Sequence, residues 1–180
     1  MKLCLGCDFK ILARTGYKSV DIHGKPDIEC DVFDLSVIPN DSCEVIIASH
    51  ILEHGYFEGA LSYRVQQVIN VLRMWKRKLI KDGKIYIAVP DFEYVVSAYF
   101  TSRENFWANE VDIIGPLLGG ATNANDFHNM IFNIYLLKYV MEQAGFQNVC
   151  EMQPGSAEFL PDVNGASRDI RSINMVGENI

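Results

Sequence analysis

The sequence lacks any apolar run that approaches the roughly 18 residues of a membrane-spanning helix, so we expect no membrane segment. Basic residues are also few: 16 Lys and Arg stand against 23 Asp and Glu, which gives a formal net charge of −7. This balance disfavours binding to nucleic acid or to an anionic membrane, because both depend on clustered Lys and Arg. The apolar stretch at the N-terminus is too short for a signal peptide, so we expect a cytoplasmic protein.

Cysteine is scarce, with five in 180 residues, and in the cytoplasm we expect them to be reduced thiols. Cys4 and Cys7 have the C-x-x-C spacing that is found in redox motifs. No second close pair of Cys or His accompanies them in the sequence, which argues against a zinc site, and we expect no metal. Two small buried thiols around a strand end are the favoured interpretation, and a redox pair is the alternative.

Strand-like and helix-like segments alternate along the chain, without repeats or long linkers. The length and the 49% of hydrophobic residues are ordinary for a single domain over residues 1–180. Apolar residues at spacings of three and four predict a helix over residues 65–79, ended by Asp82 and Gly83. We expect strands near residues 3–5, 19–22, 29–33, 44–48, 84–89, 146–152 and 170–176, and shorter helices near 91–100 and 134–144. This alternation predicts an α/β fold with a mostly parallel sheet.

Polar residues follow the expected strands at the point where each strand ends. Gly6 follows the first strand, Asp21 ends the second and Asp31 follows the third, while residues 49–54 and Asp91 follow the next two. Parallel strands end at one edge of a sheet, which is where such folds bind ligands. A glycine there lets the backbone approach a ligand closely. A carboxylate there can accept hydrogen bonds from both hydroxyls of a ribose.

Together these segments resemble class I S-adenosylmethionine-dependent methyltransferases, in particular the small bacterial branch, similar to methyltransferase type 11, that has an A-S-H-x-L-E-H segment. The matching segments are LCLGC at 3–7, VDI at 20–22, ASHILEH at 48–54, LIKDGKIYIAVPD at 79–91 and EQAGF at 142–146. They occur in the order that the family has, over roughly residues 3–150 of the chain.

The resemblance implies a Rossmann-like three-layer sandwich whose seven-stranded sheet is mostly parallel, with the last strand antiparallel. It implies S-adenosylmethionine as cofactor and S-adenosylhomocysteine as product, bound at the ends of the first four strands. The implied cofactor contacts are Gly6, Cys7 and Asp8 at the methionine part, Asp21 at the ribose, Ile22, Asp31 and Val32 around the adenine, and Ser49 and His50 beside the sulfonium.

The chain departs from the family at two places. Asp8 stands where the family usually has a glycine, although Asp tolerates left-handed backbone better than most residues. Only residues 8–18 join the first two strands, and a full crossover helix needs about a dozen residues or more, so we expect that helix to be shortened or missing. A partner subunit, as in a homodimer, or residues 101–128 would then cover the face of the sheet near the first strand.

Methyl transfer needs the acceptor, the methyl carbon and the sulfur in line, and it needs a base when the acceptor keeps its proton. His54, His50 and His128 are the candidate bases, and Glu53 would orient or cap a neighbour; purely structural roles for each are the alternative. Residues 101–128 form either a lid or a surface insertion. We expect a small-molecule or sugar acceptor, methylated at O or N.

Two other functions bear on the same residues. A nicotinamide dehydrogenase would need G-x-G-x-x-G after the first strand, and the run GCDFKI at 6–11 lacks it. A degenerate methyltransferase fold that binds a ligand or partner without catalysis is the stronger alternative, since Asp8 and the short first connection favour it.

Overall fold

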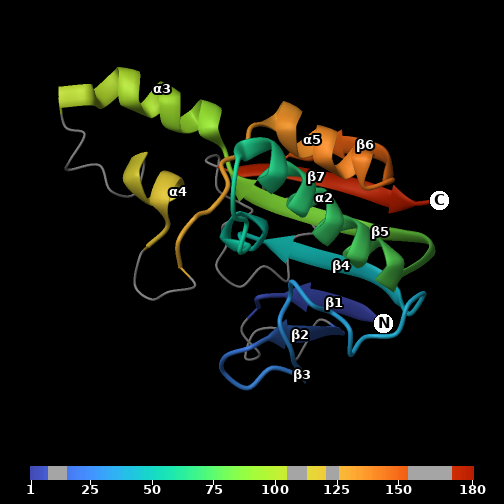
Figure 1. Ribbon diagram of the computed structural model, residues 1–180. Coiled ribbons are helices and arrows are strands. Elements are labelled where there is room, and N and C mark those ends of the chain that lie inside the picture. Colours follow the sequence, from blue (N-terminus) through green and yellow to red (C-terminus); the bar gives the residue numbers. More distant parts are fainter. Residues whose placement is uncertain (8–15, 105–112, 121–125, 154–171) are drawn as a thin grey trace.

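The computed structural model describes residues 1–7, 16–104, 113–120, 126–153 and 172–180 (Figure 1). The strands are β1 (Lys2–Leu5), β2 (Tyr17–Asp21), β3 (Ile28–Glu29), β4 (Cys43–Ser49), β5 (Leu79–Pro90), β6 (Gln147–Glu151) and β7 (Ser172–Asn179). The helices are the 3-10 helix η1 (Leu52–His54) and the α-helices α2 (Leu61–Lys78), α3 (Phe92–Ser102), α4 (Gly115–Leu118) and α5 (Ile134–Gln143). Over these residues, no helix combines the length and the apolar character needed to cross a membrane.

The seven strands form one sheet in the order β3-β2-β1-β4-β5-β7-β6. Strands β1 to β5 pair in parallel, whereas β7 runs antiparallel to both β5 and β6. The predicted seven-stranded, mostly parallel sheet with an antiparallel last strand is therefore confirmed. The chain starts in the middle of the sheet and builds outward on both sides, so the strand order reverses at β1 and β4. Sheets of this kind bind ligands at that point.

Helix α2 ends, and β5 begins, earlier than the sequence predicted. Leu79 was expected to continue the helix, but it has extended backbone (φ −76°, ψ 138°) and pairs with Cys43 as the first residue of β5. Asn179 Nδ2 donates hydrogen bonds to the carbonyl oxygens of Leu79 and Ile80, at 2.9 and 3.0 Å. Asp82, expected to end the helix, lies inside the strand with φ 62°. A contact from the other end of the chain thus overrides the local helical pattern.

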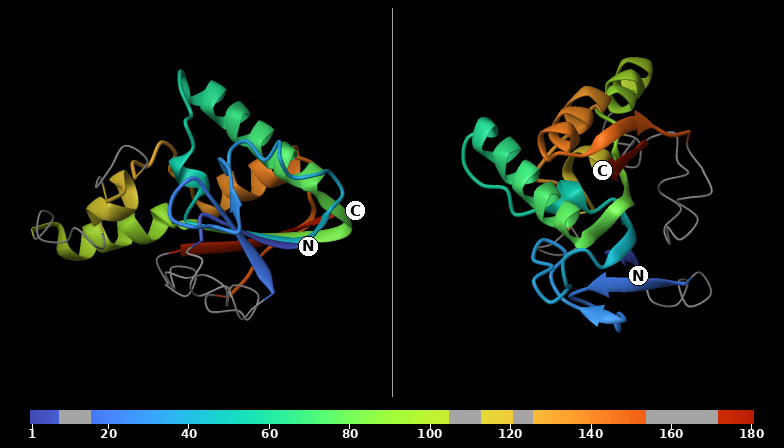
Figure 2. Two further views of the ribbon diagram at one scale, coloured as in Figure 1. Left: turned by 90° about the horizontal axis from the view of Figure 1, so that it is seen from below. Right: turned by 90° about the vertical axis from the view of Figure 1, so that its right-hand side faces the viewer.

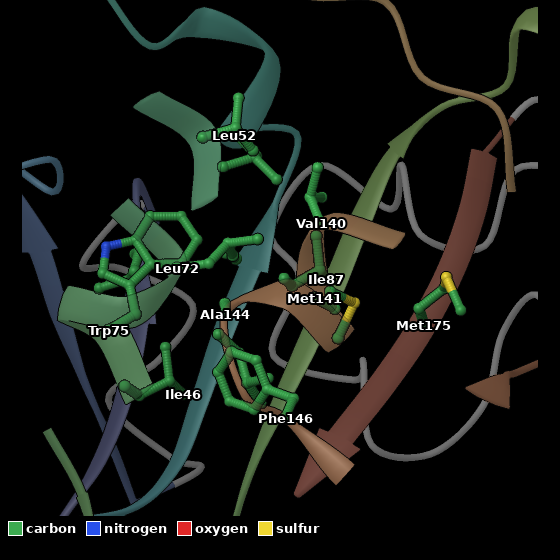
Figure 3. Close-up of a cluster of buried hydrophobic side chains, with 14 of the residues drawn as sticks. Ile46, Leu52, Leu72, Trp75, Ile87, Val140, Met141, Ala144, Phe146 and Met175 are labelled. Carbon is green, nitrogen blue, oxygen red and sulfur yellow. The ribbon is translucent and has the colours of Figure 1, made fainter. Parts of the chain in front are cut away.

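Helices α2 and α5 lie side by side on one face of the sheet (Figure 2). Leu72 and Trp75 of α2 and Val140 of α5 are fully buried, and they face Ile87 of β5 in the same interior (Figure 3). The indole Nε1 of Trp75 donates to the Val32 carbonyl oxygen at 2.7 Å, so its one polar atom is satisfied inside the core. Each such side chain contributes about 1.5–3 kcal/mol through removal from water.

The opposite face of the sheet carries a second, smaller apolar cluster. Cys4, Ile47, Tyr86 and Ala88 point to this side and are buried within the single chain, and a homodimer stays a prediction. Over the described ranges no helix packs on this cluster. Residues 8–15, where we expect the first crossover helix to be shortened or missing, lie outside the described part of the chain, so that expectation stays a prediction.

Leu72→Ala is expected to lower the free energy of unfolding by about 2–5 kcal/mol, because it removes a fully buried side chain and leaves a cavity. Leu61→Ala in the same helix is the matched control. Leu61 is 69% exposed, so its loss is expected to cost less than about 0.5 kcal/mol. Urea denaturation followed by circular dichroism measures both; equal losses would contradict the packing described for α2.

Candidate functional site

The ends of β1, β2 and β4 are level with one another at the carboxyl edge of the sheet. Leu5 pairs with Val20 on one side and with Ala48 on the other. The residues that follow these three are Gly6, Asp21 and Ser49, and they therefore emerge together at this edge. Three of the residues predicted to contact a cofactor, from separate parts of the sequence, are brought together by strand register alone.

Gly6 makes the turn that ends β1. Its backbone is left-handed, with φ +66°, and its N–H donates to the Val20 carbonyl oxygen at 2.8 Å. A Cβ at this position would overlap the side chain of Ile51, which lies against the turn from the segment after β4. Both the backbone conformation and the close approach of Ile51 require glycine here.

Cys4 and Cys7 form a disulfide bond, so the expectation of five reduced thiols is wrong for this pair. The turn at Gly6 brings Cys7 back toward the strand, with a Cα–Cα distance of 5.7 Å, which lies within the range that a disulfide spans. Cys30, Cys43 and Cys150 are free thiols. The bond braces the turn at the same edge where the cofactor contacts were predicted, and Asp8, the next residue but one after Gly6, lies outside the described residues.

The end of β2 presents a carboxylate next to an open apolar side chain. Asp21 Oδ1 accepts a hydrogen bond from the His23 N–H at 2.8 Å, which fixes the orientation of the carboxylate. Ile22 is 43% exposed. This pairing provides an acceptor for hydroxyl groups and an apolar surface directly beside it.

Asp31 and Val32 follow β3 and lie close to the end of β2, because the Cys30 N–H donates to the Asp21 carbonyl oxygen at 3.1 Å. Asp31 Oδ1 accepts from the Phe33 N–H at 2.8 Å in a local turn. The carbonyl of Val32 is bound to Trp75. These two residues therefore also shape the loop itself.

A cluster of three histidines surrounds the buried carboxylate of Glu53 beyond the end of β4. His50 has left-handed backbone, with φ 52°, and its Nδ1 lies 3.2 Å from Glu53 Oε1. His50 Nε2 lies 2.8 Å from Ser172 Oγ, at the start of β7. The rings of His54 and His128 meet edge to face, with centroids 4.6 Å apart. The three candidate bases thus converge on one carboxyl group.

Main-chain hydrogen bonds hold His128 in this cluster. The N–H groups of Asn129 and Met130 both donate to the Glu53 carbonyl oxygen, at 2.8 and 3.3 Å. His128 also contacts the end of α4: its N–H donates to the Leu118 carbonyl at 3.1 Å, and its Nδ1 lies 3.0 Å from the Pro116 carbonyl oxygen. The last part of residues 101–128, the predicted lid or insertion, is therefore tied to the cluster, whereas residues 105–112 and 121–125 lie outside the described part.

Burial and mutual charge shift the protonation of the cluster. Burial raises the pKa of the Glu53 carboxyl, but the contact with His50 and the charges of the three histidines outweigh it, so the pKa lies below its ordinary value. Burial lowers the pKa of His128, and the nearby Glu53 charge and the Pro116 carbonyl offset this only in part. Near neutral pH the carboxyl group is ionised and His128 is neutral.

A groove of about 650 Å³ opens beside the cluster. Leu61 of α2 and Phe92 of α3 provide exposed apolar surface in it, and Asn129, the neighbour of His128, lines it as well. Arg64 Nη1 donates to the Asn129 carbonyl at 3.2 Å and closes one side. Asn129 follows His128 in the sequence, so the groove and the histidine cluster are adjacent along the chain, although no histidine lines the groove.

Sequence reasoning missed Ser172 and the bond between Cys4 and Cys7. Ser172 belongs to β7, and an antiparallel last strand starts at the edge where the parallel strands end, so its first residue reaches the site. The expected direction of that strand was the signal that could have found Ser172.

No protein-family model matches the sequence, and no curated protein sequence does either. Solved structures do. An S-adenosylmethionine-dependent methyltransferase of Archaeoglobus fulgidus matches with a TM-score of 0.60 and 16% identity, over 98% of this chain and 84% of its own. One from Methanosarcina mazei has a TM-score of 0.58 and 11% identity, over 99% and 91%. A chain from the complex of the Haloferax volcanii Trm112 methyltransferase activator with its candidate methyltransferase matches with a TM-score of 0.55 and 15% identity, over 98% of this chain and 81% of its own.

The chain has the fold of class I S-adenosylmethionine-dependent methyltransferases. At these identities the likeness defines the architecture and leaves the role of each side chain to its own geometry. In the methyltransferase fold of this chain, the end of β1, the end of β2 and the turn after β4 form a continuous rim, which the glycine turn, Asp21 and the histidine cluster occupy.

Gly6→Ala is expected to destabilise the methyltransferase fold more than Gly24→Ala does. Both residues have positive φ, so each alanine adds about 1–2 kcal/mol of backbone strain. Only at position 6 does the new Cβ meet a neighbour, the Ile51 side chain, which adds about 1–3 kcal/mol of overpacking; at position 24 the space is open. Chemical denaturation of both variants measures the difference. Equal losses would show that Ile51 moves aside without cost.

Proposed function

We propose that this chain transfers a methyl group from S-adenosylmethionine to an oxygen or nitrogen atom of a small molecule or sugar. The observation that carries the proposal is the alignment of Gly6, Asp21 and Ser49 at the carboxyl edge of a methyltransferase-fold sheet.

The residues at this edge fit the parts of the cofactor. The turn at Gly6 presents main chain without a side chain, and Cys7 follows it, which suits the methionine part. The Asp21 carboxylate suits the ribose hydroxyls, and the exposed Ile22 beside it suits the flat adenine. An anchored carboxylate and an adjacent apolar surface match a ligand that has a diol next to an aromatic base.

Ser49 and His50 lie at the end of β4, where the reacting part of the cofactor would lie. When bound, S-adenosylmethionine supplies a methyl group on a positively charged sulfur, which a nucleophile displaces. Ser49 Oγ is buried without a hydrogen-bond partner in the described part of the chain, so a polar atom is available beside this position. The buried Glu53 carboxylate behind His50 favours positive charge in this region.

The groove lined by Leu61, Phe92 and Asn129 would hold the acceptor. Its exposed aromatic and aliphatic side chains suit the apolar face of a sugar or a similar ring. An acceptor oxygen or nitrogen held there would receive the methyl group that the cofactor would supply, and its proton would have to leave. The acceptor's proton then passes to a base, and neutral His128 or its neighbour His54 lies where it could accept this proton.

A non-catalytic version of the fold is not favoured, because the rim keeps the carboxylate, the open turn and the histidine cluster that catalysis would use. Binding measurements separate the two. A protein that binds neither S-adenosylmethionine nor S-adenosylhomocysteine at millimolar concentration is not a methyltransferase of this kind.

Calorimetric titration is expected to show one cofactor site per chain, and Asp21→Asn is expected to weaken binding roughly 10- to 100-fold. The substitution replaces a charged acceptor, whose hydrogen bonds contribute about 1.5–3 kcal/mol, by a neutral amide of the same shape. Asp82→Asn makes the same chemical change at the opposite edge of the sheet, at a left-handed position that Asn tolerates. If the two variants bind the cofactor with equal affinity, Asp21 does not contact it.

His54→Ala and His128→Ala are expected to slow turnover by about 10²- to 10⁴-fold, the usual contribution of a general base, if either residue takes the acceptor's proton. The affinity for S-adenosylhomocysteine should change less than about twofold, because neither substitution alters the proposed cofactor contacts at Gly6 and Asp21. Release of S-adenosylhomocysteine over a panel of sugars, phenols and amines provides the assay. If both variants keep the full turnover rate, neither His54 nor His128 is the base.

A further inference from the structure

Glu53, His54 and His128 bring three metal-binding groups into one place, although no metal was expected from the sequence. One ligand atom from each lies within 4.8 Å of the other two. Around a tetrahedral zinc ion the ligand atoms are roughly 3.3–3.6 Å apart, because each lies about 2.0–2.2 Å from the metal. Side-chain movements of roughly 1 Å would therefore close the three groups around an ion.

The scaffold holds these groups from two directions. Glu53 and His54 are consecutive in η1, and His128 is held opposite them by the two main-chain hydrogen bonds from Asn129 and Met130 to the Glu53 carbonyl. Asn129 Nδ2 also lies 3.4 Å from the His54 carbonyl oxygen, to which it donates. Ligands on a short rigid helix and on a segment bonded to its main chain form a preorganised site.

The tautomer of His128 suits a metal ligand. A carbonyl oxygen only accepts hydrogen bonds, so the contact of Nδ1 with the Pro116 carbonyl at 3.0 Å places the proton on Nδ1. The lone pair is then on Nε2. Histidines that bind metals are commonly oriented in this way, with the other ring nitrogen donating to a backbone carbonyl.

The Glu53 carboxylate lacks the partners that a buried charge needs. Its side chain is 1% exposed, and neither oxygen has a well-aligned hydrogen bond in the described part of the chain. His54 Nδ1 is buried and likewise has no hydrogen bond there. Burial of a charge costs several kcal/mol unless it is paired or coordinates a metal. His50 is close, at 3.2 Å from Oε1, and this contact orients the carboxylate while Oε2 stays available.

We propose that Glu53, His54 and His128 bind a divalent transition-metal ion of the zinc type, with His50 orienting the carboxylate. Two imidazoles and one carboxylate are a ligand set of catalytic zinc sites, which keep a further position for water or substrate. Asn129, which follows His128 in the sequence, lines the neighbouring groove. The role that follows rests on the proposed function: the ion would bind the acceptor hydroxyl and lower its pKa, the proton would pass to solvent water, and the oxygen would attack as an alkoxide. In the metal-loaded protein His54 and His128 would then act as ligands, in place of the base role that they have without metal.

The test uses the full chain without an affinity tag, stripped with a chelator, in a Cys150→Ser background because Cys150 is an exposed thiol. Zinc is titrated in competition with a chromophoric chelator, and bound metal is counted by elemental analysis. We expect one zinc per chain. The dissociation constant for zinc should rise by more than about 100-fold in each of His54→Ala, His128→Ala and Glu53→Gln, because each loses a metal ligand. It should rise by roughly 10- to 100-fold in His50→Ala, because His50 contacts a ligand but does not bind the metal itself.

His23→Ala is the matched control, since His23 is exposed at the far end of the rim, beyond β2; it should leave zinc affinity unchanged. Glu53 is fully buried, so Glu53→Gln can fail to fold. In that case the His54 and His128 variants, at partly exposed positions, test the metal site. Cobalt(II) provides a second readout, because its visible absorption in this site should vanish in His128→Ala. Absence of stoichiometric zinc in the parent chain, or zinc that the His54 and His128 variants retain, would overturn the proposal.

Cofactor binding is measured separately, without metal, so the two proposals fail independently. If the chain binds S-adenosylmethionine but no zinc, the proposed methyl transfer is supported and the proposed metal site is refuted. If the chain binds zinc but no S-adenosylmethionine, the proposed metal site is supported and the proposed methyl transfer is refuted.

Discussion

The parallel pairing of β1 with β2 on one side and β4 on the other is the constraint on which the site depends. It makes Leu5 level with Val20 and Ala48, so the residues that leave these strands do so at the same height. The same register buries Leu3 and Leu5 in the large apolar cluster, to which α2 and α5 also contribute, while Cys4 belongs to the cluster on the other side. A slip by one residue would exchange the two faces. Core packing and the alignment of the rim are therefore one requirement, and apolar burial holds the polar residues in position.

The sequence was sufficient for what depends on periodicity and strand direction. Alternating strands and helices predicted the parallel sheet, and strand ends predicted that Gly6, Asp21 and Ser49 would gather at one edge. The end of α2 was predicted wrongly because Asn179, one hundred residues further along, bonds the main chain at Leu79. Local patterns carry no information about such a contact.

The histidine cluster shows where reading a sequence stops being informative. His50 and His54 were recognisable as polar residues after a strand end, and His128 as a residue at the end of residues 101–128. Their common target, Glu53, and the main-chain bonds that bring His128 to it could not be predicted from the sequence. Side-chain convergence depends on the path of a loop, here residues 126–130, and loop paths follow from tertiary bonds more than from periodicity. The disulfide at Cys4 and Cys7 is a further case, since it depends on one left-handed turn.

The contact between His50 and Ser172 joins residues that are 122 positions apart. On the ribosome, β1 to β5 and α2 are synthesised long before β7, and a contact of such long range is slow to form because the intervening chain must first be closed into a loop. The nascent protein can thus bury most of its apolar core while His50 still lacks its partner. The contact between His50 and Ser172 therefore requires β7 to be synthesised and paired with β5, so the histidine cluster is completed only with the C-terminal strand.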